Sequence, residues 1–340
     1  KSILKLTDED YNKNGLSDLL ALEGSSYDLN INMFNHFQNT ITGWPGGKPG
    51  ADDSTRPERK SPNSKRVIIF SPHPDDDVVS MGGTFDRLVS QGHEVHIAYQ
   101  VKGNIAVSDH DALKFIEVSK DMFKNESKIP VSELIKELKN NKPDKIDSQA
   151  VRDLKGFIRK REAIAATRYI GIPDSNTHFM NLPFYDTGRI KKNPPTKKDV
   201  LITASLIKKI KPHQIFAAGD LEDPHGTHKV CLDIILDALD TLKGEKFIKD
   251  CWLWLYRGAW LDWDVHDIDM AVPMSPAQVL RKRKAIFFHQ TQKDGVMFQG
   301  QDLREFWVRA EERNSETAEK YKKMGLADYA AIESFKRHYY

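Results

Sequence analysis

The chain has 340 residues, of which 39% are hydrophobic and 29% are charged, a composition typical of soluble globular proteins. Lysine and arginine number 51 against 49 aspartate and glutamate, so the formal net charge is only +2. This balance excludes a dominant electrostatic attraction to nucleic acid or to an anionic membrane, and it favours a small molecule as the partner.

The two cysteines and the lengths of the apolar stretches indicate the cellular compartment of the protein. Cys231 and Cys251 lie in apolar surroundings without metal-ligand spacing, which predicts reduced core residues in a reducing compartment. Strongly apolar stretches such as 251–256 are too short to span a bilayer, and no signal segment opens the chain. We therefore expect a cytoplasmic protein without membrane insertion. The first residue, Lys1, is consistent with a piece of a longer protein or with a processed form.

The predicted elements begin with an N-terminal arm and linker, residues 1–65, whose second half is rich in glycine, proline and charge. A short apolar run at 67–70 predicts a buried strand, and helix-compatible sequence follows at 78–91. A second apolar strand is predicted at 94–101. Strand, helix and strand in this order predict a parallel βαβ unit.

The remaining elements repeat this alternation. They are helices near 153–171, 200–209 and 227–242, strands at 214–218, 251–256 and 269–272, and a helix from Ser275-Pro276 to about 288. We therefore predict a three-layer α/β/α domain with a mostly parallel, Rossmann-like sheet over residues 66–292. Residues 293–340 are charged and helical in pattern, and we expect them to form extra C-terminal helices packed on the core.

The residues after the first predicted strand carry a chemical signal. Ligands of open α/β sheets bind outside the carboxyl ends of the strands, and residues 71–77 read Ser-Pro-His-Pro-Asp-Asp-Asp. His73 and Asp76, three residues apart in a proline-stiffened turn, can supply two ligands to one zinc ion. Asp75 would stay unligated, close enough to take a proton from a zinc-bound water. The alternative is a turn that only caps the next helix.

A second polar cluster follows the predicted strand at 214–218. Residues 219–228 read Gly-Asp-Leu-Glu-Asp-Pro-His-Gly-Thr-His and lead into a helix. His225 and His228 share a face of its first turn, so His228 can be the third ligand while His225 points at the substrate. Two histidines and one carboxylate leave an open zinc position, as in hydrolytic sites. A His-x-x-His pair taken alone is more often made of surface or core histidines.

Together, Pro-His-Pro-Asp-Asp at 72–76 and His-x-x-His at 225–228 resemble the motifs of the PIG-L/LmbE-like family of zinc N-deacetylases. The resemblance spans about residues 66–292. Members remove acetyl groups from N-acetylglucosamine units of glycolipid precursors, mycothiol precursors and smaller sugars. Two departures concern Asp77, where many relatives have glutamate, and Gly226-Thr227, which replaces the usual Pro-Asp and could change the orientation of the histidine before it.

The resemblance implies a role for each motif residue. His73, Asp76 and His228 would hold one Zn²⁺ ion, with another divalent metal as an alternative. Asp75 would be the general base, and His225 the electrostatic partner of the oxyanion or the acid for the leaving amine. Zinc-activated water would attack the amide carbonyl, so that acetate and a free amino sugar result.

Softer matches to the family indicate substrate contacts. By similarity, Asn104, Arg159 and Asp186 would contact sugar hydroxyls or a phosphate. Arg159 could equally form an intrahelical pair with Glu162, and Asp186 could equally serve a turn. The run His-Gln-Thr-Gln at 289–292 also matches, although its histidine could simply end the preceding helix.

The N-terminal stretch offers a further resemblance. Residues 5–11, Lys-Leu-Thr-Asp-Glu-Asp-Tyr, with Gly15-Leu16 after them, look like the tail of a sugar-phosphate isomerase domain related to glucosamine-6-phosphate deaminase. This implies an upstream isomerase-like domain in the native protein. The sequence leaves the oligomeric state open, a homo-oligomer included.

The function we expect is therefore a zinc-dependent hydrolase that removes an N-acetyl group from an N-acetylglucosamine-type sugar. One alternative is a module of a glucosamine-6-phosphate deaminase-like amino-sugar enzyme. Another is a non-catalytic module that binds zinc or sugar, although such a module would not need Asp75. A third is a zinc hydrolase of a non-sugar amide, because specificity lies in loops.

Overall fold

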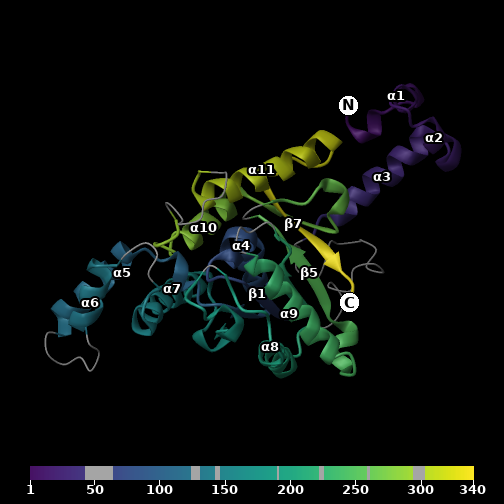
Figure 1. Cartoon of the computed structure of the whole chain (residues 1–340). Coiled ribbons are helices and arrows are strands. Elements are labelled where there is room, and N and C mark those ends of the chain that lie inside the picture. Colours follow the sequence, from purple (N-terminus) through teal and green to yellow (C-terminus); the bar gives the residue numbers. More distant parts are fainter. Residues whose placement is uncertain are drawn as a thin grey trace.

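The centre of the molecule is a seven-stranded sheet with the strand order β3-β2-β1-β4-β5-β7-β6 (Figure 1). The computed structural model describes residues 1–42, 64–123, 131–141, 146–189, 191–221, 226–258, 261–293 and 303–340. The strands are β1 Arg66–Ser71, β2 Glu94–Tyr99, β3 Thr177–Phe179, β4 Gln214–Ala218, β5 Trp252–Tyr256, β6 Met270–Met274 and β7 Ala331–His338. Neighbours from β3 to β5 pair in parallel, whereas β7 is antiparallel to both β5 and β6.

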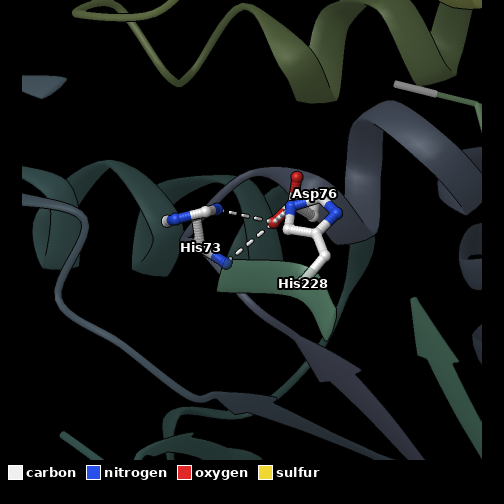
Figure 2. A group of neighbouring side chains, drawn as sticks. All are labelled: His73, Asp76 and His228. Atoms are coloured by element: carbon white, nitrogen blue, oxygen red, sulfur yellow. Dashed lines mark hydrogen bonds and ion pairs between the residues drawn. The ribbon is translucent and has the colours of Figure 1, made fainter. Parts of the chain in front are cut away.

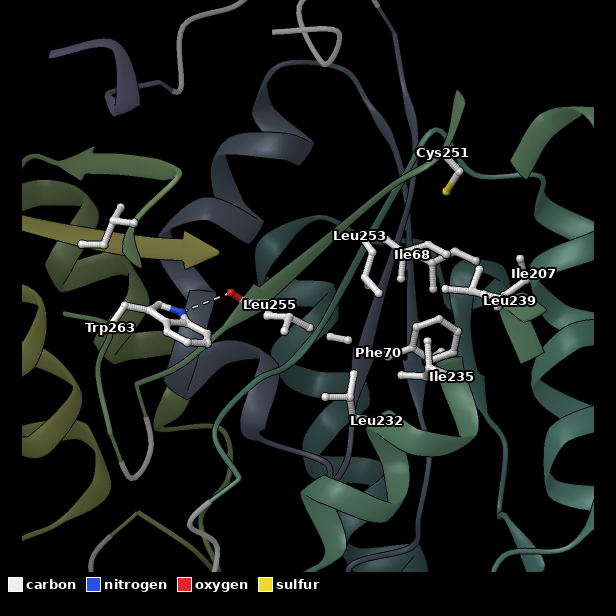
Figure 3. Close-up of a cluster of buried hydrophobic side chains, with 14 of the residues drawn as sticks. Ile68, Phe70, Ile207, Leu232, Ile235, Leu239, Cys251, Leu253, Leu255 and Trp263 are labelled. Carbon is white, nitrogen blue, oxygen red and sulfur yellow. Dashed lines mark hydrogen bonds between the residues drawn. The ribbon is translucent and has the colours of Figure 1, made fainter. Parts of the chain in front are cut away.

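Helices cover both faces of the sheet. After an N-terminal group, α1 Asp8–Lys13, α2 Ser17–Glu23 and α3 Ser26–Thr40, the helices are α4 Asp76–Ser90, α5 Asp109–Phe123, α6 Val131–Lys139, α7 Gln149–Ile170, α8 Lys197–Ile210, α9 Thr227–Thr241, α10 Pro276–Ile286 and α11 Phe306–Met324. Strand β1 shows the layering, because alternate side chains point to opposite faces. Ile68 and Phe70 pack with α8 and α9 (Figure 3), and Val67 and Ile69 pack with α4 and α7.

The structure confirms the predicted fold class, a three-layer α/β domain with a mostly parallel sheet. Several short features are additional. Helices α5 and α6 and the three-residue strand β3 were not predicted, and the N-terminal arm contains helices that extend away from the sheet (Figure 1). The division of the chain at residues 65/66 and 292/293 stays a prediction.

The C-terminal region contains the predicted helix, α11, and also strand β7, which the sequence pattern did not predict. Residues 331–338 read Ala-Ile-Glu-Ser-Phe-Lys-Arg-His, so charge interrupts the expected alternation of a strand. Strand β7 nevertheless lies inside the sheet, between β5 and β6, where Glu333 is buried. Within the described residues, no helix combines the length and the apolar character that crossing a membrane requires.

Candidate active site

The candidate site lies where β1 ends and α4 begins. Asp77 anchors this turn: its carboxylate accepts hydrogen bonds from the Ser71 hydroxyl at 3.1 Å and from the Tyr99 hydroxyl, also at 3.1 Å. Complete burial raises the pKa of Asp77 to about 7. Asp77 therefore ties the turn to β1 and to β2, the neighbouring strand, and so positions the residues just before it.

Three donor groups converge beside this turn, those of His73, Asp76 and His228 (Figure 2). One carboxylate oxygen of Asp76, Oδ2, lies 3.2 Å from Nδ1 of His73 and 3.2 Å from Nε2 of His228. Ligands on a tetrahedral zinc at bond lengths of about 2.0–2.1 Å are about 3.3 Å apart. The donor set therefore fits one zinc ion in both chemistry and spacing.

A hydrogen bond to the backbone fixes the orientation of the His228 ring. Its Nδ1 donates a hydrogen bond to the backbone carbonyl of Asp220 at 2.8 Å, and a carbonyl can only accept. The other nitrogen, Nε2, is therefore the unprotonated one and faces Asp76. The Asp220 carboxylate in turn accepts a hydrogen bond from the backbone N–H of Leu261 at 3.0 Å. Loops after β4 and β5 thus hold the histidine in the form that a metal requires.

The two adjacent aspartates have opposite electrostatic surroundings. Burial opposes ionisation of Asp76, but His228 and His73 outweigh it and hold the pKa of Asp76 well below its usual value. Burial raises the pKa of Asp75, and the guanidinium of Arg159 only partly offsets this. A pair of neighbouring carboxyl groups with divergent pKa values is the pattern of a charged ligand beside an acid–base group.

Arg159 reaches the site from α7 and is fully buried. Its Nη2 lies 3.0 Å from Oδ1 of Asp75 and donates to the Pro74 carbonyl at 3.3 Å. The predicted alternative is an intrahelical ion pair with Glu162, but the ion pair that the structure shows is with Asp75, and Glu162 accepts two hydrogen bonds from Thr291 at 2.8 Å each. Arg159 Nε and Nη1 are buried without a hydrogen-bond partner among the described residues, so they are available to a ligand.

The other two predicted substrate-contact residues differ in how far they are buried. Asn104 is buried at the start of a single 3-10 turn after β2. The side chain of Asp186 is 44% exposed, and its carboxylate lies 3.9 Å from the ammonium of Lys102. His225 lies outside the described residues. Sequence reasoning missed Tyr185, whose ring centroid is 6.2 Å from that of His73.

The run at 289–292 packs against the site. Thr291 binds Glu162 of α7, and the Gln292 amide donates to the Ala106 carbonyl at 3.0 Å. His289 is buried, and burial lowers its pKa to about 3, so its imidazole is neutral. The segment after α10 therefore closes one side of the site.

A mostly parallel α/β sheet with a His-Asp-His donor set at the ends of its strands defines a Rossmann-like protein with a candidate metal centre. The chain belongs to the PIG-L family: the match, described as GlcNAc-PI de-N-acetylase, covers residues 68–239. This result confirms the family predicted from the two motifs.

Individual relatives give further context. A protein from Bacteroides thetaiotaomicron, named as a putative glucosamine-6-phosphate deaminase-like protein, is 53% identical over 344 residues. The alignment covers 98% of this chain and 52% of that protein, so the chain spans about half the length of this relative. An N,N'-diacetylchitobiose deacetylase from Pyrococcus horikoshii superposes with a TM-score of 0.50 at 17% identity, covering 84% of this chain and 89% of that one. The second likeness shows a shared fold.

Proposed function

We propose that this chain is a zinc-dependent hydrolase that removes the N-acetyl group from an N-acetylglucosamine-type sugar. Membership of the PIG-L family supports the reaction and the substrate class. The observation that carries the proposal is the position of Asp75: it is buried next to the donor set, held by Arg159 at 3.0 Å, and not one of the three donors. A metal site with only a structural role has no use for such a carboxylate.

In the proposed mechanism, side chains of the protein transfer protons during hydrolysis of the substrate's amide bond. Zinc, when held by His73, Asp76 and His228, supplies Lewis acidity to water and to the amide carbonyl. Asp75 takes a proton from the attacking water, and the new C–O bond turns the carbonyl carbon tetrahedral. The C–N bond then breaks, Asp75 or His225 returns a proton to the nitrogen, and acetate and a free amine leave. Arg159 keeps Asp75 in place.

Substrate contacts are proposed for Arg159, Asn104 and Asp186. The buried Nε–H and Nη1–H groups of Arg159 can donate to sugar hydroxyls, since nothing else in the described chain accepts from them. Asn104 and the exposed carboxylate of Asp186 would bind further hydroxyls. A second candidate function, a module of a larger amino-sugar enzyme, is favoured by the name and the greater length of the Bacteroides relative.

Metal removal is the first test of this proposal. We expect acetate release from N-acetylglucosamine to disappear with a chelator and to return with zinc. His228→Ala is expected to weaken zinc binding by more than roughly 100-fold, because even an outer-shell partner contributes 10–100-fold. Zinc content by mass spectrometry and acetate release are the measurements.

The chain offers a matched control for this variant. His266 belongs to a second group of potential donors, with Asp264 and Asp267, that lies on the surface. His266→Ala is expected to change neither zinc content nor rate. If His266→Ala removed the metal and His228→Ala did not, the proposed centre would be wrong. If native protein loaded with zinc released no acetate from a wide panel of acylated amines, a binding module would be favoured instead.

A further inference from the structure

The two histidine donors of the candidate site are held in different ways. His228 donates its second ring N–H to the Asp220 carbonyl at 2.8 Å. His73 directs Nδ1 at Asp76, and its other ring nitrogen, Nε2, points away from the donor set (Figure 2) and has no hydrogen-bond partner among the described residues. Histidines that bind a metal usually donate this second N–H to a fixed acceptor. A contact of another kind therefore has to orient the His73 ring.

The ring of Tyr185 supplies such a contact. The centroids of the two rings are 6.2 Å apart and their planes meet at 70°, an edge-to-face arrangement. Tyr185 is only 6% exposed. Its hydroxyl makes no hydrogen bond to any other part of the chain that the structure describes. The part of Tyr185 that acts on His73 is therefore the ring and not the hydroxyl.

The same side chain also packs against the helix that carries His228. Tyr185 belongs to a buried apolar cluster with Cys231 and Ile234 of α9. Cys231 lies less than one helical turn beyond His228. The tyrosine ring therefore joins the turn that carries one histidine donor to the helix that carries the other. Removing its volume would leave a space between two segments that have to converge on one metal ion.

The backbone next to Tyr185 is tied to helix α8. Tyr185 ends a single 3-10 turn, Pro183–Tyr185, that follows β3. The N–H of Phe184 in this turn donates to the buried Asp199 carboxylate of α8 at 3.0 Å, and the Phe184 carbonyl accepts from the Asn193 N–H at 3.1 Å. The turn is thus fixed on both sides of the Phe184 peptide, so it presents the next side chain, Tyr185, in one direction.

A cation restrains the Tyr185 ring as well. The ammonium of Lys192 lies 3.8 Å from the centroid of this ring and donates to the Arg189 carbonyl at 2.6 Å. Burial lowers the pKa of Lys192 to about 8, so the ammonium is still charged at neutral pH but only partly solvated. A partly desolvated cation over an aromatic ring contributes more than an exposed one does. Lys192 therefore stabilises the ring in the position from which it meets His73.

We propose that Tyr185 is a positioning residue of the candidate metal centre, which orients His73 and keeps His73 and His228 close together, and that Lys192 restrains Tyr185. The inference rests on the proposed function, because that function supplies the metal. It adds a residue that lies in neither of the two motifs. Tyr185 is not a ligand and acts through His73, so its effect is expected on metal binding before any substrate is present.

The test titrates Co²⁺ alone into the metal-free chain and follows the visible absorption of the ion, which depends on its coordination geometry. Tyr185→Leu is expected to weaken Co²⁺ binding by about 10–100-fold, the usual effect of changing a partner of a metal ligand, and to change the spectrum of the fully loaded protein. Tyr185→Phe keeps the ring, so its affinity should stay within about threefold of native and its spectrum should match the native one.

Two further variants complete the comparison. Lys192→Met is expected to weaken Co²⁺ binding by about two- to fivefold, the usual contribution of one cation–π contact, and it keeps the test decisive should Tyr185→Leu not fold. Tyr321→Leu is the matched control, because Tyr321 is a fully buried tyrosine that packs against Phe37 and Thr40 of α3. It should lower the melting temperature and leave both the affinity and the spectrum unchanged.

The possible outcomes separate this inference from the proposed function. Native affinity and a native spectrum in folded Tyr185→Leu would overturn the positioning role and leave the hydrolase standing. Equal losses in Tyr185→Leu and Tyr185→Phe would also overturn it, since they would assign the effect to the hydroxyl. The expected pattern of Co²⁺ binding without acetate release by the native chain would support the positioning role and overturn the hydrolase. A native chain that binds no Co²⁺ would overturn both.

Discussion

Replacing Asp75 by asparagine is expected to lower kcat by roughly 10²–10⁴-fold, the usual contribution of a positioned general base. Asparagine keeps the shape of the side chain but cannot take a proton from water. Because Asp75 is not among the donors His73, Asp76 and His228, zinc should remain bound. The measurement is acetate release at saturating substrate, with zinc content determined on the same sample.

The neighbouring aspartate provides the matched control. Asp76→Asn changes a donor that lies 3.2 Å from two histidine nitrogens, so it is expected to lose zinc as well as activity. Asp75→Asn also leaves the buried Arg159 without its 3.0 Å charge partner, so rates must be compared per folded molecule, judged by circular dichroism. A kcat within about threefold of native at full zinc occupancy would contradict the assignment of Asp75 as the base.

The sequence predicted best those elements whose apolar pattern is uninterrupted. Strands β1 and β4 are buried on both faces and read as short apolar runs, and the polar clusters directly after them mark the carboxyl ends of the strands. Because parallel strands place these ends at one edge of the sheet, the two polar clusters together with the family resemblance predicted that His73, Asp76 and His228 act together.

Elements that depend on distant partners could not be predicted in this way. Strand β3 has three residues, too few for a periodic signal, and exists because it pairs with β2. Strand β7 carries Glu333, a residue type that is usually exposed but is buried here. Glu333 of this strand forms a buried ion pair with Lys282, 51 positions away, which a local sequence pattern cannot reveal.

Within the site, the partner of Arg159 likewise could not be predicted from the sequence. Spacing along α7 permits a pair with Glu162, and chain order permits contact with the loop after β1. In the structure the ion pair of Arg159 is with Asp75, and Glu162 accepts hydrogen bonds from Thr291, a residue far along the chain.

The buried ion pair of Lys282 on α10 and Glu333 on β7 lies against α4, the helix that begins at the candidate site. Both side chains are at most 1% exposed, and their charged atoms are 2.8 Å apart. Helix α4 breaks at Met81, where φ is −135° and ψ is 27°, so the N–H groups of the next turn lack helical acceptors. The Glu333 carboxylate accepts from the backbone N–H groups of Gly83 at 2.9 Å and Thr84 at 2.6 Å. It therefore acts as a cap supplied by a distant strand.

Glu333→Leu is expected to lower the free energy of unfolding by roughly 3–5 kcal/mol, because it leaves a buried ammonium unpaired and two buried N–H groups without acceptors. Urea denaturation measures this. Lys282→Met combined with Glu333→Leu should recover part of the loss, since no charge is then stranded. Glu245→Ala breaks an exposed pair with Lys208 at 2.6 Å and should cost less than about 1 kcal/mol. Equal losses for Glu333→Leu and Glu245→Ala would mean that the β7 carboxylate does not hold α4, and that the two halves of the site helix are kept together by apolar packing alone.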